Sequence, residues 1–194
     1  MLRTIATVLI VLAIAIGGGA ASVWYALGAT GGLGALEAGV WTAYPFAGTP
    51  QADPYSRARV SRDADLPLGG AEGIVFVAAR DSGGSLLRRD CMYRVEGNVP
   101  PARIWTLYPA DPAHVPLPSL GQRPPALSSL GVLRAPDNAL IVTASQRVAP
   151  GNWLPVSGSG PMTLVLTLYD TAVASNEAIA AVDMPQVLRV SCDD

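Results

Sequence analysis

The feature that most constrains this chain is a long apolar segment near its N-terminus. After Arg3 the next charged residue is Glu37, and the stretch Thr4–Leu27 contains apolar, aromatic and small residues throughout. As an α-helix this stretch would be about 36 Å long, enough to cross a hydrocarbon layer of about 30 Å. Trp24 and Tyr25 lie near its end, where aromatic side chains favour the membrane interface. The sequence therefore predicts a membrane-spanning helix.

The charge beside this helix predicts its orientation. Arg3 precedes the helix, and positive charge stays on the cytoplasmic side, so the rest of the chain is expected across the membrane. A cleaved signal peptide with residues 4–16 as its apolar centre is the alternative. However, Gly19-Ala20-Ala21 is not an Ala-x-Ala cleavage site, and apolar character continues past it. We therefore expect an uncleaved anchor over residues 1–30, and export of the body in either case.

The composition of the remaining chain predicts a tether followed by one folded domain. Residues 31–39 are rich in glycine, which disfavours a stable helix and suits a flexible linker. Residues 40–194 match the usual size of a single domain. The whole chain is 50% hydrophobic and 14% charged, so it has enough apolar material for a core and is not expected to be disordered.

The body shows short apolar runs separated by Pro, Gly, Asp and Asn, which is typical of β-structure. We expect six strands, at residues 72–79, 91–96, 103–108, 139–145, 162–169 and 187–192. The turn Asp81–Gly84 is expected to join the first two as a hairpin, and the loop Gly97–Pro101 to close the next pair. Repeated short strands of this kind favour a β-sandwich or jelly roll.

Two short helices are expected to interrupt the strands. Asp53 can cap a helix over residues 53–63, with Pro54 at its first position, and three arginines would make this helix a solvated one: Arg57, Arg59 and Arg62. A second helix is expected over residues 172–181, capped by Asp170 or Ser175. The proline-rich stretch 109–125 is expected to be an extended loop.

The two cysteines are placed at the ends of predicted strands. Cys91 opens one strand and Cys192 closes the last. In an oxidising exported compartment such a pair is most simply a disulfide, although two unconnected buried thiols are the alternative. A disulfide here would hold the C-terminal strand on its sheet.

Several classes of function are disfavoured by composition. The net charge is −2 with no cluster of like charges, so a nucleic-acid partner is not expected. Two Cys and one His are too few for most zinc sites built from protein ligands, and we expect neither a metal nor a cofactor. The sequence lacks a Gly-x-Ser-x-Gly elbow and phosphate-binding loops, and His114 lies alone in the proline-rich loop. We assign no catalytic residue.

Aromatic and arginine side chains suggest a binding surface in the body. Trp105, Tyr108 and Trp153 lie on or beside predicted strands, and Arg94 and Arg103 are close in sequence. Aromatic faces with Arg side chains can recognise sugars, anions or another protein. The alternative is that the rings fill the core. The segment 152–155, Asn-Trp-Leu-Pro, is expected to be a fixed loop that plugs one end of the sheet.

A series of segments in the body carries a family resemblance. From Trp41 onward the chain contains, in order, WTAYPFAGTPQADPYSRARVSR, AEGIVFVAARDSGGSLLRRDCMYRVEG, PPARIWTLYPAD, APDNALIVTAS, GNWLP and MTLVLTLYD. This series resembles the bacterial family known as domain of unknown function 1214, DUF1214, and covers nearly all of the body. It is most similar to the short members with one N-terminal membrane helix. In this chain the segment Trp105–Pro109 is one residue tighter than the family pattern. The family implies no activity, and no catalytic residue is carried over.

These observations combine into one expected architecture. We expect a mainly β protein, in which a single N-terminal transmembrane helix precedes a jelly-roll-like β-sandwich with one or two short helices. The resemblance implies the jelly-roll-like sandwich and a bacterial protein, and the charge beside the helix predicts an inner-membrane protein with a cytoplasmic N-terminus and a periplasmic body.

Two functions are compatible with this architecture. The leading hypothesis is a non-enzymatic binding module or accessory subunit, which contacts the bilayer through its helix and a protein partner or envelope ligand through its body. The alternative is an envelope hydrolase or sugar-modifying enzyme, which would need two carboxyl groups about 5–9.5 Å apart in a cleft beside Trp105 or Trp153.

Overall fold

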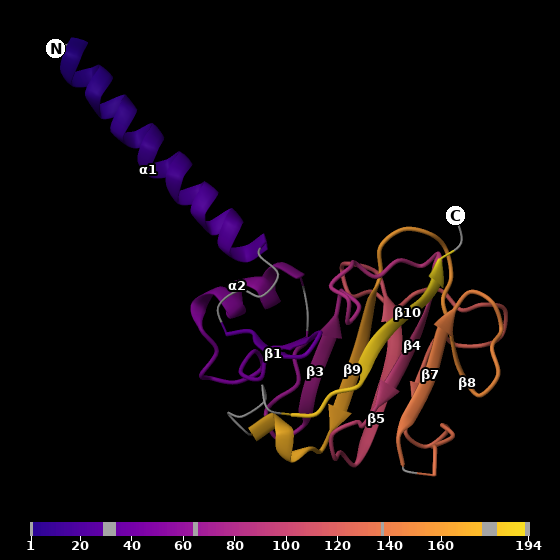
Figure 1. The fold of residues 1–194 in the computed structure, drawn as a ribbon. Coiled ribbons are helices and arrows are strands. Elements are labelled where there is room, and N and C mark those ends of the chain that lie inside the picture. The colour runs from indigo at the N-terminus through magenta and orange to yellow at the C-terminus, as the bar shows by residue number, and fades with distance from the viewer. Residues whose placement is uncertain (1, 29–33, 64–65, 137, 176–181, 193–194) are drawn as a thin grey trace.

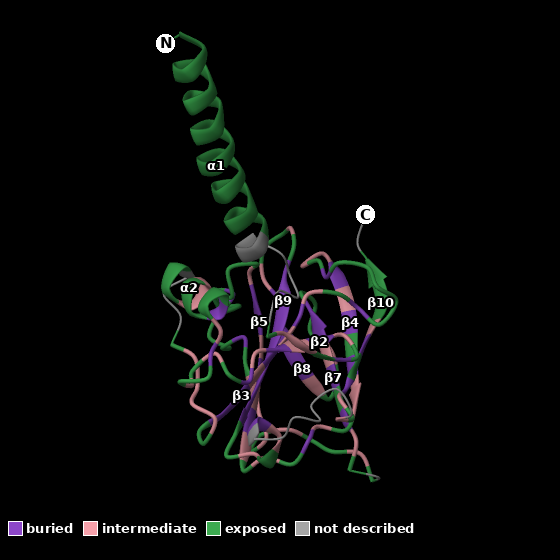
Figure 2. Cartoon of the chain, turned by 90° about the vertical axis from the view of Figure 1, so that its left-hand side faces the viewer, coloured by how far each residue is buried: buried purple, intermediate pink, exposed green. Residues whose placement is uncertain are grey.

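A computed structural model describes residues 2–28, 34–63, 66–136, 138–175 and 182–192. A long helix, α1 (Leu2–Gly28), extends from a β-rich body (Figure 1). Its bounds agree with the predicted membrane helix, and the helix is long and apolar enough to cross a membrane, a property that signal sequences share. The side chains of Leu2–Tyr25 are exposed on every side (Figure 2).

The body consists of two β-sheets. The first has the strand order β1-β2-β3-β9-β5-β6, and the second has the order β10-β4-β7-β8. The strands of the first sheet, in that order, are Leu36–Ala38, Trp41–Ala43, Gly73–Ala78, Thr163–Tyr169, Ile104–Ala110 and Leu127–Ser128. Those of the second sheet are Gln186–Cys192, Cys91–Gly97, Leu140–Ser145 and Asn152–Pro155. All neighbouring strands named here are antiparallel except β7 and β8, which are parallel.

The core lies between the two sheets. Buried side chains alternate with more exposed ones along β4, where Cys91, Tyr93 and Val95 point inward. Phe76 on β3 and Leu107 on β5 are buried in the same cluster from the opposite sheet. Each large apolar side chain buried in this way contributes about 1.5–3 kcal/mol. The mainly β, two-sheet fold is therefore confirmed, and it is compatible with the jelly-roll-like arrangement that we expected.

All six predicted strands are present as β3, β4, β5, β7, β9 and β10, and their ends differ from the prediction by at most two residues. The predicted turn forms a short antiparallel bridge between Arg80 and Leu86, but the prediction that it pairs the first two strands is wrong. Gly84 donates its N–H to the Asp81 carbonyl at 2.8 Å, so a tight turn does form. Yet β3 and β4 belong to different sheets, and so do β4 and β5. The turn residues specify a local reversal, but burial of both inner faces sends consecutive strands to opposite layers.

Four short strands were not predicted. The segment 152–155, expected as a plugging loop, is strand β8, which pairs in parallel with β7. Part of the expected tether, Leu36–Ala38, is strand β1 and pairs with β2. Strand β6 covers Leu127–Ser128. These strands span two to four residues, too few for a period of two to be recognised, and tertiary pairing selects them.

The two remaining elements are short helices. Helix α2 covers Pro54–Asp63, as predicted. The second predicted helix is observed as a single 3₁₀ turn, η1 (Ala172–Ser175), and the rest of its predicted range, 176–181, lies outside the described residues.

The predicted disulfide is present. Cys91 and Cys192 are paired residues of the neighbouring strands β4 and β10, and their sulfur atoms are bonded. Strand β10 is an edge strand, so the bond fixes the C-terminal strand to the sheet.

Candidate functional site

A pocket of about 380 Å³ lies where α2 meets the segment after β2, a volume within the range of small-molecule sites. We call it the membrane-proximal pocket. It is lined mainly by apolar and aromatic atoms, from Gly34, Tyr44, Phe46, Ala47, Gln51, Asp53, Pro54, Tyr55 and Ser56. Phe46 and Tyr55 are 46% and 41% exposed, so both rings are partly open to the outside. The pocket therefore opens to the outside through an apolar rim.

The N-terminus of α2 forms one wall of this pocket. Asp53 Oδ1 accepts the N–H groups of Tyr55 at 2.9 Å and Ser56 at 3.1 Å, which is the predicted helix cap. The buried Ser56 hydroxyl donates to Asp53 Oδ2 at 2.5 Å, and with the helix N–H groups it lowers the pKa of Asp53 from its usual 3.8. The carboxylate is thus ionised, and its oxygens are hydrogen-bonded to groups at the helix N-terminus.

Gly34 forms the wall opposite Asp53. Its φ is +82°, and a Cβ at this position would lie 3.0 Å from Asp53 Oδ2. A glycine is therefore required both for the backbone conformation and for the close approach of the chain to the helix cap.

Successive turns hold the aromatic wall. The N–H of Ala47 donates to the Tyr44 carbonyl at 3.1 Å, and the N–H of Thr49 donates to the Phe46 carbonyl at 2.9 Å. Arg57 on α2 then donates to the Pro50 carbonyl at 2.6 Å, which ties this loop to the helix. The aromatic rings are therefore presented by a folded segment.

Positive charge lies beside the pocket. The guanidinium carbon of Arg59 is 5.0 Å from the centre of the Tyr44 ring, a cation–π contact over one pocket wall. Arg57 and Arg62 are exposed on the same helix. An apolar hollow with arginines at its edge can accommodate a ligand that has an apolar part and an anionic part.

The pocket is close to α1 both along the chain and in space. Helix α1 ends at Gly28, and Gly34 in the pocket wall follows six residues later, a separation of at most about 21 Å. Helices α1 and α2 contact each other, and α2 lies beside the end of α1 in both ribbon views (Figures 1 and 2).

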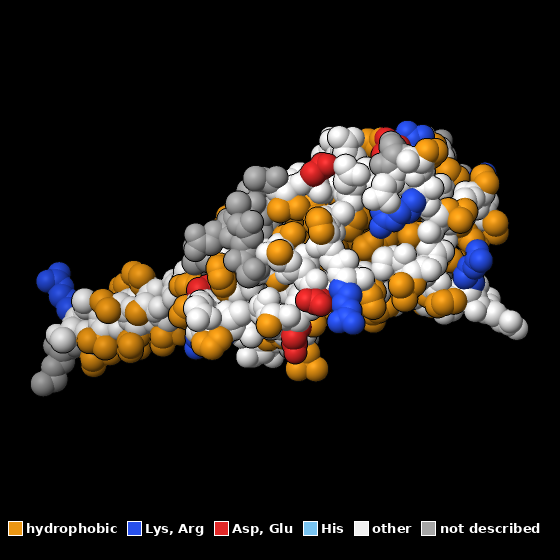
Figure 3. All heavy atoms as spheres, turned by 90° about the horizontal axis from the view of Figure 1, so that it is seen from below, with side chains coloured by type: hydrophobic (Ala, Val, Ile, Leu, Met, Phe, Trp, Pro, Cys, Tyr) orange, Lys and Arg blue, Asp and Glu red, His pale blue; other side chains and the backbone are white. Residues whose placement is uncertain are grey.

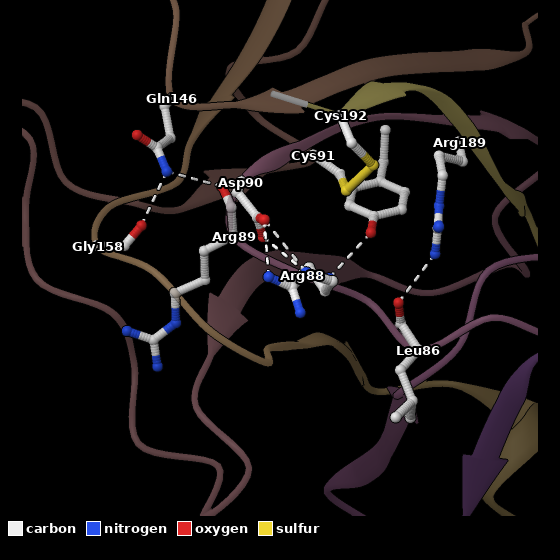
Figure 4. Close-up of polar contacts among 10 residues, drawn as sticks. Leu86, Arg88, Arg89, Asp90, Cys91, Gln146, Gly158, Arg189 and Cys192 are labelled. Atoms are coloured by element: carbon white, nitrogen blue, oxygen red, sulfur yellow. Dashed lines mark hydrogen bonds and ion pairs between the residues drawn. A yellow bond between two sulfur atoms is a disulfide. The ribbon is translucent and has the colours of Figure 1, made fainter. Parts of the chain in front are cut away.

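A second polar network surrounds β10 and the disulfide (Figure 4). The buried Asp81 carboxylate accepts the N–H groups of Gly83 at 3.0 Å and Ser85 at 2.9 Å, and it pairs with Arg189 Nε at 2.9 Å. Arg189 also donates to the Leu86 carbonyl at 2.9 Å. These bonds link the turn after β3 to β10 and are structural.

Next to this network, Arg88 and Asp90 form an exposed ion pair at 2.8 Å, and its hydrogen bonds lower the pKa of Asp90. Gln146 donates to the carbonyls of Arg89 at 2.9 Å and Gly158 at 2.8 Å (Figure 4). The hollow beside the disulfide measures about 30 Å³, room for about two waters rather than a ligand.

The structure does not assemble the predicted binding surface. Trp105 and Trp153 are 2% and 7% exposed and belong to different sheets. Trp153 Nε1 donates to the Ser145 carbonyl at 3.0 Å, and the Arg123 guanidinium covers its ring at 5.6 Å. Trp105 Nε1 is buried without an acceptor among the described residues. The alternative interpretation, that these rings fill the core, therefore holds for both tryptophans.

The other members of that predicted surface are also dispersed. Tyr108 is half-buried on β5. Arg94 pairs with Glu96 at 2.6 Å on the second sheet. Arg103 pairs with Asp170 at 3.7 Å beside the first sheet. The arginines are exposed, as expected, but each has its own carboxylate partner.

Several of the described carboxylates are also occupied locally. Hydrogen bonds or ion pairs within their own segment or to a neighbouring strand hold Glu72, Asp81, Asp90, Glu96, Asp111 and Asp170. Across the described ranges, no three His, Cys, Asp or Glu side chains gather where they could hold a metal ion. The paired carboxyl groups of the hydrolase alternative, beside Trp105 or Trp153, find no open cleft there because both rings are buried.

Sequence reasoning missed the membrane-proximal pocket. It treated Arg57, Arg59 and Arg62 as a solvated helix face and did not connect them with the aromatic residues just before α2. The available signal was the concentration of Tyr44, Phe46 and Tyr55 within a short distance of a membrane helix, beside arginines.

Comparisons with known proteins agree with the fold. A model of the family described as "Protein of unknown function (DUF1214)" matches residues 72–173. The VPA0106 protein from Vibrio parahaemolyticus is similar in structure with a TM-score of 0.57 and 16% identity, over 71% of this chain and 36% of that one. An uncharacterized protein from Burkholderia cenocepacia gives a TM-score of 0.41 and 14% identity, over 75% and 45%.

The likeness to the Vibrio protein concerns the fold alone, and this chain spans about a third of the length of that protein. A search of curated proteins found no match. The membrane-proximal pocket is built from residues 34–56, which precede the segment that the family model matches.

Proposed function

Because this chain belongs to the DUF1214 family, we propose that it is a single-pass membrane protein of that family whose β-sandwich body is a non-enzymatic binding module or accessory subunit on the oxidising side of a bacterial inner membrane. In this arrangement the N-terminus is cytoplasmic and the body is periplasmic. The body is held near the bilayer, where it can meet a membrane-embedded partner or an envelope ligand.

The observation that carries the proposal is the unburied apolar surface of α1. The side chains of Leu2–Tyr25 contact no core of this chain, and apolar side chains line the helix in the view from below (Figure 3). Apolar surface left in water costs about 25 cal/mol per Å², so such a helix requires lipid or another protein around it. Trp24 and Tyr25, at its C-terminal end, suit the far interface.

The disulfide supports the proposal that the body lies on the oxidising side of the membrane. Bonds of this kind persist in oxidising compartments and are rare in the cytosol. The bond between Cys91 and Cys192 therefore favours the orientation in which the body follows the helix across the bilayer.

The topology is tested with the full chain carrying alkaline phosphatase at its C-terminus, because this enzyme is active only after export. We expect phosphatase activity, retention in carbonate-washed membranes, and a mass that includes residues 1–30. An inactive reporter would contradict the orientation. A shortened, soluble product would instead establish the signal-peptide alternative.

The accessory role is tested by purification in mild detergent after chemical cross-linking in cells. We expect a membrane protein to be cross-linked to the body and to remain bound. Recovery of the free chain in every detergent, with no cross-linked product, would contradict the subunit role while leaving the topology intact.

A further inference from the structure

We propose that the membrane-proximal pocket binds an anionic phospholipid of the same bilayer that holds α1, with acyl carbons against its aromatic wall and the phosphate at Arg59. The proposal rests on the proposed anchoring, since it takes its ligand from that membrane. It deepens the proposed function by naming a ligand class and the residues that contact it.

The tether limits how far the pocket can lie from the bilayer surface. Tyr25 is at the end of α1 that suits the interface, and Gly34 forms part of the pocket wall. Nine residues of chain separate them, which span at most about 32 Å. Lipid of that bilayer therefore lies within reach of the pocket.

The chemistry of the pocket matches the apolar part of a lipid. Its volume is about 380 Å³ and its lining is mainly apolar. Phe46 and Tyr55 are large side chains that remain nearly half exposed at its rim. Aromatic side chains in this state favour the boundary between headgroups and acyl chains.

The charge beside the pocket matches the anionic part. The guanidinium carbon of Arg59 lies 5.0 Å from the centre of the Tyr44 ring, so a cation is held beside one wall of the pocket, and a guanidinium group suits phosphate oxygens. Arg57 and Arg62 add positive charge on the same helix. The carboxylate in the pocket lining, Asp53, is bonded to the helix N–H groups and to Ser56. Arg59 is therefore the cation that we assign to the anionic part of the ligand.

A lipid fits this position better than a soluble ligand or a protein. The pocket is formed by the first folded segment after the anchor, so its opening and the bilayer are joined by the same short piece of chain. A protein partner at this site is the competing outcome of the test.

The test uses the purified full chain in vesicles that contain phosphatidylglycerol with a photoreactive diazirine in its acyl chain. After illumination, adducts are mapped by mass spectrometry. We expect adducts on α1 and also on residues 44–56. Adducts on α1 alone would overturn the lipid site and leave the anchor standing. A chain that neither floats with the vesicles nor is labelled would overturn the proposed anchoring and the lipid site together.

Variants distinguish a specific site from mere closeness to lipid. Arg59→Gln should reduce labelling of residues 44–56 by phosphatidylglycerol about fivefold, since one arginine near an anionic surface has an effect of that size, and should leave α1 labelling unchanged. Arg103→Gln, which changes an exposed arginine beside the first sheet, is the matched control and should behave as wild type. Equal labelling of the Arg59→Gln variant and the wild type would overturn the role of Arg59.

The apolar wall is tested in the same way. The double variant Phe46→Ser and Tyr55→Ser should lose most labelling of residues 44–56. The matched control Leu130→Ser and Leu133→Ser removes two exposed apolar side chains elsewhere and should retain it. All four positions are exposed, so folding is preserved, which is verified by circular dichroism. Undiminished labelling of the first variant would overturn the pocket as the binding site.

Discussion

Asp53 is the residue at which local sequence and pocket structure meet. Its type and its place before Pro54 predict a helix cap, and the cap is present. The same carboxylate also forms part of the pocket wall, where it faces Gly34. The Asp53 side chain thus caps the start of α2 and also lies close to the backbone of Gly34.

Replacement of this cap should weaken the folded state. Asp53→Ala should lower the free energy of unfolding of the full chain in detergent by about 1 kcal/mol, because two helix N–H groups lose their acceptor. Chemical denaturation followed by circular dichroism measures this. Asp90→Ala, which removes an exposed ion pair, is the control and should change stability less. Equal effects of the two substitutions would contradict the capping role.

The contribution of Asp53 should also depend on pH. Its pKa is lower in the folded chain than in the unfolded chain, where it is about 3.9. The stabilisation is therefore present above that pH and is lost as the pH falls through the folded-state pKa. Denaturation of the wild type and of Asp53→Asn between about pH 2 and 6 checks this. The variant should show the weaker acid dependence; identical pH profiles would exclude the effect.

At the scale of elements, the existence of strand β4 follows from its own residues, whereas its pairing partners are strands that lie far along the chain. A short run of residues bounded by turn residues predicts the strand, and in the structure Tyr93 and Val95 are buried on its inner face. Its neighbours are β10 and β7, both far along the chain, and not the strands that precede and follow it. The predicted hairpin failed because a turn motif cannot specify which layer the next strand joins.

The disulfide should contribute strongly to the stability of β10. Cys91 and Cys192 are separated by 101 residues, and the entropy lost by the unfolded chain when such a loop is closed corresponds to at most about 4.7 kcal/mol. Cys91→Ser with Cys192→Ser should lower the free energy of unfolding and increase hydrogen exchange in residues 186–192 first. The reduced wild-type chain is the control and should match the double variant. Alkylation of both thiols in the unreduced native protein would contradict the bond.

At the scale of the whole molecule, an apolar helix and a β-sandwich meet at one junction. The body has its own core between two sheets, whereas α1 has no burial within the chain. The pocket is lined in part by α2, and α2 lies beside the end of α1 (Figure 1).

This separation of the two parts predicts the effect of removing the helix. A chain lacking residues 1–30 but exported by a cleavable signal peptide should leave the membrane fraction, because it lacks the helix that is long and apolar enough to cross a membrane. It should still form the disulfide, since the core of the body does not include α1. Fractionation and thiol alkylation measure the two results. Full retention of the truncated chain in carbonate-washed membranes would show that the body itself is the main anchor.

Sequence alone determined the features that depend on neighbouring residues. These are the apolar helix, the six longer strands, the cap of α2 and, through compartment chemistry, the pairing of Cys91 with Cys192. Each follows from hydrophobic period, capping chemistry or composition within a short stretch, which act in the same way wherever the stretch lies.

Tertiary structure alone decided the features that depend on distant residues. It assigned successive strands to different sheets, buried Trp105 and Trp153, and selected the short strands β1, β6 and β8. It also brought Gly34, Tyr44 and Asp53 together around a pocket. The physical reason is that an aromatic ring or a short run of residues has the same local sequence pattern whether it is buried or exposed. Its burial depends on the distant parts of the chain that pack against it.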